Sequence, residues 1–190
     1  MVLSRRFEEA LLFATRLHAS QLRKGTEIPY ASHLLSVAGI ALEYGADEDE
    51  AIAALLHDAI EDQGGAAIRE EIRTRFGEKV VEIVNGCTDV EVLPKPPWRE
   101  RKEAYVAHLR HASPSVRLVS AADKLHNIMT ILKDYKATGD ALWSRFKGDK
   151  EGPLWYYRCL VYAFQAGDAS PIVEELNRYV TDLEELVCGR

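Results

Sequence analysis

Apolar residues recur at helical spacing along almost the whole chain, and this periodicity constrains the fold more than any other feature. In residues 4–19, for example, Phe7, Leu11, Ala14 and Leu17 follow one another at intervals of three or four. That spacing places their side chains on one face of an α-helix. No stretch shows a convincing alternation of apolar and polar residues, which a half-buried β-strand requires. The sequence therefore predicts an all-α protein.

Glycines, prolines and capping residues divide this pattern into about eight to ten helices. The expected helices cover residues 4–19, 31–44, 47–64, 66–76, 77–87, 98–111, 114–135, 139–146, 151–166 and 170–187. Ser113 and Ser170 each precede a proline, which is typical of a capped helix start. A polar loop at 20–30 and a proline-rich loop at 89–97 separate helices. Because residues on both sides of the second loop are candidates for one site, we expect a single domain spanning residues 1–190.

Composition limits the classes of function. The 190 residues are 47% hydrophobic and 28% charged, as in a globular domain with its own core. The net charge of −6 disfavours nonspecific binding to nucleic acid. No apolar run reaches the length of a membrane span, and the N-terminus does not resemble a signal peptide. We therefore expect a cytoplasmic protein with three reduced thiols, Cys87, Cys159 and Cys188.

The most informative stretch is ALLHDAIEDQGG, residues 54–65. Residues four apart share a helix face, so the expected helix places His57 above Glu61 and Asp58 above Asp62. These acids would lie near the C-terminal end of that helix, where its dipole disfavours negative charge. The apolar residues before them indicate a buried helix, and buried carboxylates are costly unless they are paired or bind a metal. The alternative interpretation is a solvated helix end.

Two further stretches carry polar residues on otherwise apolar helices. In SAADKLHNIMT, residues 120–130, Asp123, Asn127 and Thr130 share one face of a long helix. An internal hydrogen bond between the aspartate and the asparagine is an alternative interpretation of this face. In PYASH, His33 begins a helix after a proline turn. A lone histidine is more often structural than a ligand, so its role depends on the other residues.

Together, four of these side chains offer two imidazoles and two carboxylates: His33, His57, Asp58 and Asp123. A mixed nitrogen and oxygen set suits a divalent cation that keeps room for water, with manganese preferred over iron, zinc and magnesium. A bound cation would stabilise Asp58 and lower the cost of the acids near it. The sequence therefore predicts a metal site.

These motifs resemble those of HD-domain metal-dependent phosphohydrolases, and within them the small stand-alone Rel/Spo-type alarmone hydrolases. The resemblance rests on HxxQxRKG at 18–25, PYxxH at 29–33, LLHDxxED at 55–62, FG at 76–77, Thr88 and ADKLHNxxT at 122–130. It extends from residue 14 to about residue 135. Leu34 stands where such proteins often have proline, and the loop at 89–102 and the region after 135 match only loosely.

The resemblance implies a helical HD domain that hydrolyses the 3′-pyrophosphate of (p)ppGpp to GDP or GTP and pyrophosphate, usually with manganese. By resemblance, the metal ligands are His33, His57, Asp58 and Asp123. Glu61 and Asp62 would activate or orient the attacking water. The chemistry is consistent, because a metal lowers the pKa of bound water and a nearby carboxylate can accept the proton.

Substrate contacts are implied in the same way. Arg23 and Lys24 match the family's base-contacting pair, and Asn127 and Thr130 would contact the nucleoside. A basic run beside Trp98 is a candidate for phosphate binding, although it equally fits a solvated loop: Lys95, Arg99, Arg101 and Lys102. His18 and His126 are expected to support the site or to pack.

Two other functions fit the same residues. One is an HD phosphohydrolase acting on another nucleotide, such as a nucleoside monophosphate, a cyclic nucleotide or NADPH. The other is a nucleotide-binding sensor without catalysis, which has no need of both Glu61 and Asp62. In each case the expected partner is a small nucleotide, not nucleic acid or a membrane, and the protein is either a monomer or a homodimer.

Overall fold

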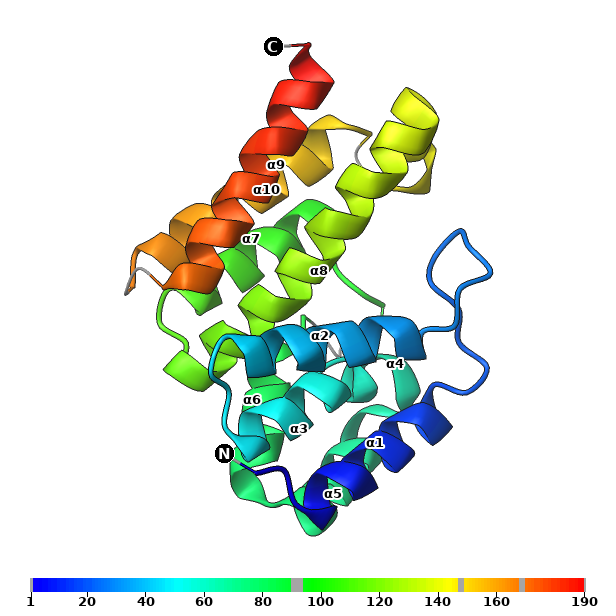
Figure 1. The fold of residues 1–190 in the computed structure, drawn as a ribbon, viewed down its shortest axis with the longest axis vertical. Coiled ribbons are helices and arrows are strands. Elements are labelled where there is room, and N and C mark those ends of the chain that lie inside the picture. The colour runs from blue at the N-terminus through cyan, green and yellow to red at the C-terminus, as the bar shows by residue number, and fades with distance from the viewer. Residues whose placement is uncertain (1, 90–93, 147–148, 168–169, 190) are drawn as a thin grey trace. The chain divides into compact units, whose positions relative to one another are not determined.

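A computed structural model describes residues 2–89, 94–146, 149–167 and 170–189. The helices are α1 Arg5–Leu17, α2 Ala31–Glu43, α3 Glu48–Leu56, α4 Ala59–Gln63, α5 Gly65–Phe76, α6 Glu78–Cys87, α7 Trp98–Leu109, α8 Pro114–Thr138, the 3₁₀ helix η1 Gly139–Arg145, α9 Glu151–Gln165 and α10 Pro171–Cys188 (Figure 1). In these ranges, β-pairing is limited to an isolated bridge between Leu22 and Pro29. The all-α prediction is confirmed. Residues 90–93 of the expected proline-rich loop lie outside the described residues.

The chain forms two compact units. The first contains Met1–Lys95 and Ala112–Ala122, and the second contains Pro96–His111 and Asp123–Arg190. Helix α8 contributes residues to both. Among the helices of the described ranges, none is long and apolar enough to cross a membrane.

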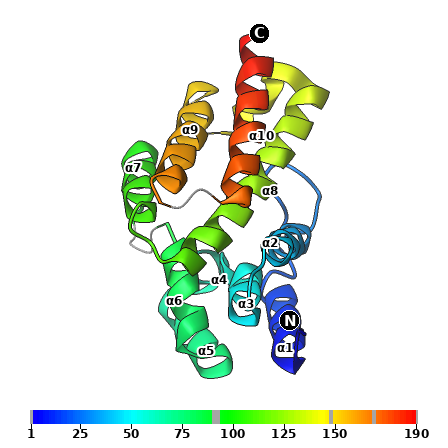
Figure 2. The ribbon, with the colours of Figure 1, turned by 60° about the vertical axis from the view of Figure 1, so that its left-hand side comes forward.

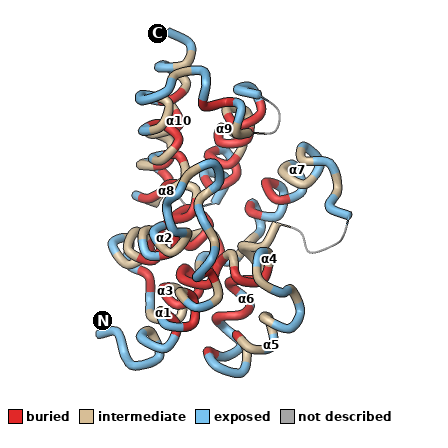
Figure 3. The backbone as a smooth tube through the Cα atoms, turned by 90° about the vertical axis from the view of Figure 1, so that its right-hand side faces the viewer, coloured by how far each residue is buried: buried red, intermediate tan, exposed pale blue. Residues whose placement is uncertain are grey.

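Helix α3 forms the centre of the first unit. All six residues from Ala51 to Leu56 are buried, and α1, α2 and α6 pack against this helix (Figure 3). Its first turn is fixed by a capping box. The Asp47 side chain accepts the backbone N–H of Glu50, and the Glu50 side chain accepts that of Asp47. The buried helix therefore holds the two residues that follow it, His57 and Asp58, in a fixed position.

The prediction of one continuous helix over residues 47–64 is wrong, because α3 ends at Leu56 and α4 begins at Ala59. The Ala54 carbonyl, which a continuous helix would offer to the N–H of Asp58, accepts a hydrogen bond from His57 Nδ1 at 2.8 Å. Asp58 becomes the residue before α4, and Glu61 and Asp62 lie in its first turn. The acids therefore do not oppose the dipole of a long helix.

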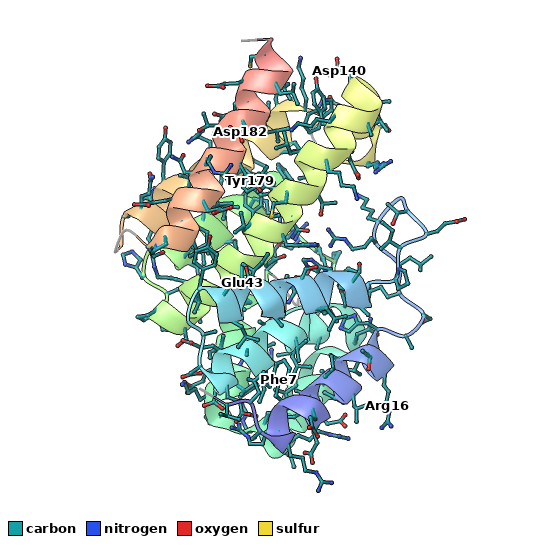
Figure 4. All side chains as sticks on the ribbon, in the orientation of Figure 1. Phe7, Arg16, Glu43, Asp140, Tyr179 and Asp182 are labelled. Carbon is teal, nitrogen blue, oxygen red and sulfur yellow. The ribbon has the colours of Figure 1, made fainter. Side chains whose placement is uncertain are left out.

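The second unit is built around α9. This helix packs against α7 and α10 (Figure 2). Arg158 on α9 links it to α10 through a bidentate contact with Glu184 and through hydrogen bonds to Asn177 and Thr181. Charged side chains such as Asp182 lie on the exposed face of α10 (Figure 4).

Two smaller sequence expectations differ in detail. The helix expected at 139–146 is a 3₁₀ helix that follows α8 directly. Ser113 accepts the backbone N–H of Val116 at 3.3 Å, as expected of a cap. Ser170, in contrast, makes no side-chain cap, although Pro171 occupies the first turn of α10. The fixed φ of proline favours a helix start at this position.

Candidate metal centre and active site

Three side chains of the first unit converge on one point. His33 lies in the first turn of α2, and His57 and Asp58 occupy the junction of α3 and α4. The two Nε2 atoms are 3.2 Å apart. Asp58 Oδ2 lies 2.9 Å from His57 Nε2 and 3.7 Å from His33 Nε2. Both imidazoles are buried, so this is an enclosed cluster and not a solvated helix end.

The donor set fits a divalent cation. Because a carbonyl can only accept, the bond from His57 Nδ1 to the Ala54 carbonyl places a proton on Nδ1 and leaves Nε2, which lies near Asp58, available to a cation. Tyr30 donates its hydroxyl to Asp58 Oδ2. The three ligand atoms lie within 4.8 Å of one another. A cation among them would satisfy two imidazole nitrogens and one carboxylate at once.

Glu61 lies beside this cluster and is held by two donors. Lys95 Nζ is 2.7 Å from Glu61 Oε1. The backbone N–H of Asp89 donates to Oε2 at 3.3 Å. These contacts connect Glu61 to both sides of the loop between α6 and α7. A phosphate-binding candidate from the sequence, Lys95, thus contacts a catalytic candidate.

Asp62 has different surroundings. Its Oδ2 accepts a hydrogen bond from Gln21 Nε2 at 2.8 Å. Burial by neighbouring atoms raises the pKa of Asp62, although part of the residue is exposed. The Gln21 bond opposes this rise in pKa, and the negative charges of Asp58 and Glu61 add to it. A raised pKa makes Asp62 a stronger base than an ordinary aspartate.

The loop that precedes α2 carries the base-contacting candidates. Arg23 N donates to the Ile28 carbonyl at 2.8 Å and Tyr30 N to the Gln21 carbonyl at 2.9 Å. The Arg23 guanidinium lies 5.8 Å from the centre of the Tyr30 ring. Lys24 is exposed at the turn. The loop therefore has a defined backbone that presents these two basic side chains.

The polar face of α8 lies in the second unit. Asp123 accepts hydrogen bonds from Asn127 Nδ2 and Lys124 Nζ. Burial by itself would lower the pKa of Lys124, but the charge of Asp123 raises it well above its ordinary value. Thr130 donates to the carbonyl of His126 at 3.0 Å. The internal pair of aspartate and asparagine is present, and a role of Asp123 as a metal ligand is a proposal.

The basic run after residue 95 also belongs to the second unit and packs on aromatic rings. The Arg99 guanidinium lies 3.2 Å from the centre of the Trp155 ring. Lys102 Nζ lies 5.1 Å from that of Tyr156, and Arg101 Nε donates to the Pro96 carbonyl at 3.3 Å. These contacts order the basic side chains locally.

The first unit thus brings together six of the candidates from the sequence: His33, His57, Asp58, Glu61, Asp62 and Lys95. The second unit holds Asp123, Asn127, Thr130, Arg101 and Lys102. No individual role was predicted from the sequence for the supporting residues Gln21, Tyr30, Asp89 and Gln63, the last of which donates to Gln21 at 2.6 Å. Gln21 and Tyr30 stand in the quoted motifs, and their fixed spacing from His18 and His33 is the signal that could have revealed them.

An all-helical fold with a buried His–His–Asp cluster at a helix junction defines the class. A family model described as an HD domain matches residues 10–152. The chain belongs to the HD-domain family.

Individual proteins that are similar to this chain give a more specific comparison than the family model. The chain is 42% identical to guanosine-3′,5′-bis(diphosphate) 3′-pyrophosphohydrolase MESH1 of Xenopus tropicalis, over 72% of this chain and 73% of that protein. The structure of a metazoan ortholog of SpoT that hydrolyses ppGpp matches with a TM-score of 0.79 and 25% identity, over 96% of this chain and 98% of that one. The crystal structure of lmo0812 from Listeria monocytogenes EGD-e matches with a TM-score of 0.72 and 29% identity, over 80% and 97%.

Proposed function

We propose that this protein is a metal-dependent hydrolase that removes the 3′-pyrophosphate of (p)ppGpp. The observation that carries the proposal is the convergence of His33 Nε2, His57 Nε2 and Asp58 Oδ2 directly before the two carboxylates of α4. The substrate follows from the relatives, because a MESH1 3′-pyrophosphohydrolase is 42% identical over most of this chain.

The metal would be held by His33, His57 and Asp58, with Asp123 proposed as the fourth ligand and Mn²⁺ as the preferred ion. When bound, such a cation supplies Lewis-acid polarisation of a phosphoryl oxygen and lowers the pKa of a water molecule. The protein's own part is to hold these ligand atoms in one orientation. The His57 bond to Ala54 and the Tyr30 bond to Asp58 do this.

Glu61 and Asp62 handle the attacking water in this proposal. Glu61 accepts a proton from the water as the water oxygen attacks the phosphorus next to the ribose O3′. The bond between that phosphorus and O3′ breaks, O3′ takes up a proton, and the products are GDP or GTP and pyrophosphate. Asp62, held by Gln21, orients the water for this attack.

The remaining candidates would bind the substrate. Arg23 has the planar guanidinium that stacks on a purine, and Lys24 lies next to it. Asn127 and Thr130 would contact the nucleoside. The phosphates would be bound by Lys95, Arg101 and Lys102. Free cysteines fit a reducing compartment, so we propose a cytoplasmic enzyme. A homodimer stays a prediction.

Product analysis tests this function. Purified protein is incubated with ppGpp and Mn²⁺, with an EDTA control, and with GMP, cyclic nucleotides and NADPH in parallel. We expect GDP and pyrophosphate from ppGpp only when the metal is present. Phosphate release from another nucleotide without turnover of ppGpp would contradict the substrate and keep the metal site. Nucleotide binding without turnover with any divalent metal would identify a sensor.

A further inference from the structure

Gln21 makes a direct contact with a proposed catalytic carboxylate. Its Nε2 donates to Asp62 Oδ2 at 2.8 Å. Gln21 is half-buried in the loop after α1, far in sequence from α4. A glutamine amide can donate at one end and accept at the other, so its effect on Asp62 depends on which end faces the carboxylate.

Two donors fix the Gln21 amide in the useful orientation. Gln21 Oε1 lies 2.7 Å from His18 Nδ1 and accepts a hydrogen bond from Gln63 Nε2 at 2.6 Å. A rotated amide would direct Oε1 at Asp62 Oδ2, placing two acceptors in contact. The surroundings therefore select the orientation in which Gln21 donates to Asp62.

The surroundings of the His18 ring agree with this arrangement. His18 is 2% exposed, and its Nε2 has no hydrogen-bond partner among the described residues. A proton on Nε2 would be a buried donor without an acceptor, which is costly. The tautomer with its proton on Nδ1 avoids that cost and donates to Gln21. The Gln63 Nε2 is farther from Nδ1, at 3.4 Å, as expected when both atoms are donors.

The same loop also contacts the metal cluster, through Tyr30. The backbone N–H of Tyr30 donates to the Gln21 carbonyl at 2.9 Å, next to the bridge between Leu22 and Pro29. The Tyr30 ring stacks on His18 with 5.3 Å between centroids and 19° between planes. Its hydroxyl donates to Asp58. Gln21 thus contacts Asp62, and Tyr30, which is bonded to Gln21 through the backbone, contacts Asp58.

We propose that Gln21 is a positioning residue that holds the Asp62 carboxylate for the reaction, and that His18 and Gln63 orient the Gln21 amide. Two hydrogen bonds in series join His18 to Gln21 and Gln21 to Asp62, and a third joins Gln63 to Gln21. The proposal rests on the proposed function for the role of Asp62, whereas the hydrogen bonds themselves can be tested without substrate or metal.

The first test uses the side-chain amides of ¹⁵N-labelled protein without metal. Gln21, Gln63 and Gln165 are assigned by single substitutions to methionine. We expect Asp62→Ala to shift the Gln21 Nε2 resonance and to speed its hydrogen exchange. The amide of Gln165, exposed on α9, should not change and serves as the control. An unchanged Gln21 resonance would overturn the proposed bond whatever the substrate of the enzyme is.

The second test uses the kinetics of Gln21→Met, which preserves volume and removes the donor. We expect kcat for ppGpp to fall by about 10-fold or more, as for supporting residues of metal sites, with KM changed less than about twofold. The matched control Gln165→Met should keep the native kcat. In an Asp62→Asn background, Gln21→Met should cause little further loss, because the positioned group is already absent.

A merely structural role gives a different pattern. It would lower the melting temperature and reduce kcat by the same factor in both backgrounds, and that result would overturn the proposal. Should Gln21→Met fail to fold, His18→Phe replaces it in the comparison with the Asp62→Asn background. That substitution removes the donor that contacts Gln21 Oε1. Absence of ppGpp turnover by the unaltered protein would refute the proposed function, and the resonance test would still decide the contact.

Discussion

Two acidic clusters lie at opposite ends of α3 and have very different surroundings. The first cluster begins the helix and consists of Asp47, Glu48, Asp49 and Glu50. The second cluster follows the helix and consists of Asp58, Glu61 and Asp62. Both belong to the first compact unit. Both clusters consist of aspartates and glutamates, so a comparison of their contacts shows the effect of the surrounding residues.

The first cluster is bound by long, partly exposed basic side chains. Lys79 contacts Asp47 at 2.5 Å, and both side chains are 50% exposed. Arg6 contacts Asp49 at 2.8 Å. Such ion pairs contribute at most about 1 kcal/mol each, because water screens them. The rest of the cluster's role is to cap α3.

The second cluster is bound mainly by groups with fixed positions. Asp58 contacts two buried imidazoles and a tyrosine hydroxyl. Asp62 accepts an amide hydrogen bond, and Glu61 contacts a lysine, Lys95. The type and burial of the partners, and not the number of acids, therefore distinguish the candidate active site from the helix cap.

The largest expected effect is that of Asp58→Asn. The substitution removes the carboxylate from the metal cluster, so metal binding and hydrolysis should be lost together. Activity should fall below about one-hundredth of the native value, because even residues that only support ligands cost that much. Metal content is measured by elemental analysis after dialysis. Asp49→Asn in the first cluster is the matched control, and equal loss in both variants would remove the distinction between the clusters.

Glu61→Gln should separate two functions of the second cluster, metal binding and the activation of water. The amide cannot accept the proton from water, so we expect turnover to fall by about 10²-fold or more while metal binding stays native. Single-turnover rates and metal content are measured on the same sample. Glu48→Gln provides the control at the other end of α3. Native turnover by the Glu61 variant would show that another group accepts the proton.

Each cluster contacts a lysine, Lys79 in the first cluster and Lys95 in the second. The variants Lys79→Met and Lys95→Met test whether the two lysines have different roles. Lys95 is proposed to bind phosphate and also contacts Glu61, so we expect kcat/KM to fall by roughly 5-fold, equivalent to about 1 kcal/mol. Lys79→Met should affect thermal stability and leave kcat/KM unchanged. Steady-state kinetics at two salt concentrations measure both. A larger effect from Lys79 than from Lys95 would contradict the assignment of the clusters.

The smallest effect concerns pH and the first cluster. Although burial raises the pKa of Asp47, hydrogen bonds from Lys79 and from the backbone of Glu50 lower it overall, below its ordinary value of 3.8. A lowered pKa in the folded state stabilises the protein above the unfolded pKa, and this contribution is lost as pH falls through the folded pKa. We expect urea unfolding of the native protein and of Asp47→Asn to differ most above about pH 5. A difference that grows on acidification would contradict the sign.

Much of the fold followed from the sequence because helical periodicity reports which face is buried. The boundaries of α2, α5, α9 and α10 differ from their predictions by a residue or two. The break between α3 and α4 was missed, because it depends on a side chain, His57, competing for a backbone carbonyl. Residue spacing alone does not show that competition.

The candidate site, like the fold, was predictable in part. The residue types predicted a metal cluster, and the fold brings His33 to His57 and Asp58. The contact between Glu61 and Lys95 and the Gln21 bond to Asp62 join residues far apart in sequence. Such contacts depend on the tertiary path of two loops, which hydrophobic periodicity does not encode.

The most direct test of the central claim is a metal titration. Protein freed of metal with a chelator is titrated with Mn²⁺, and bound metal and ppGpp hydrolysis are measured in the same samples. We expect no hydrolysis without metal, activity that rises to a plateau at about one ion per chain, and loss of that binding in His57→Ala. Full hydrolysis by the metal-free protein, or native metal binding by His57→Ala, would contradict the central claim.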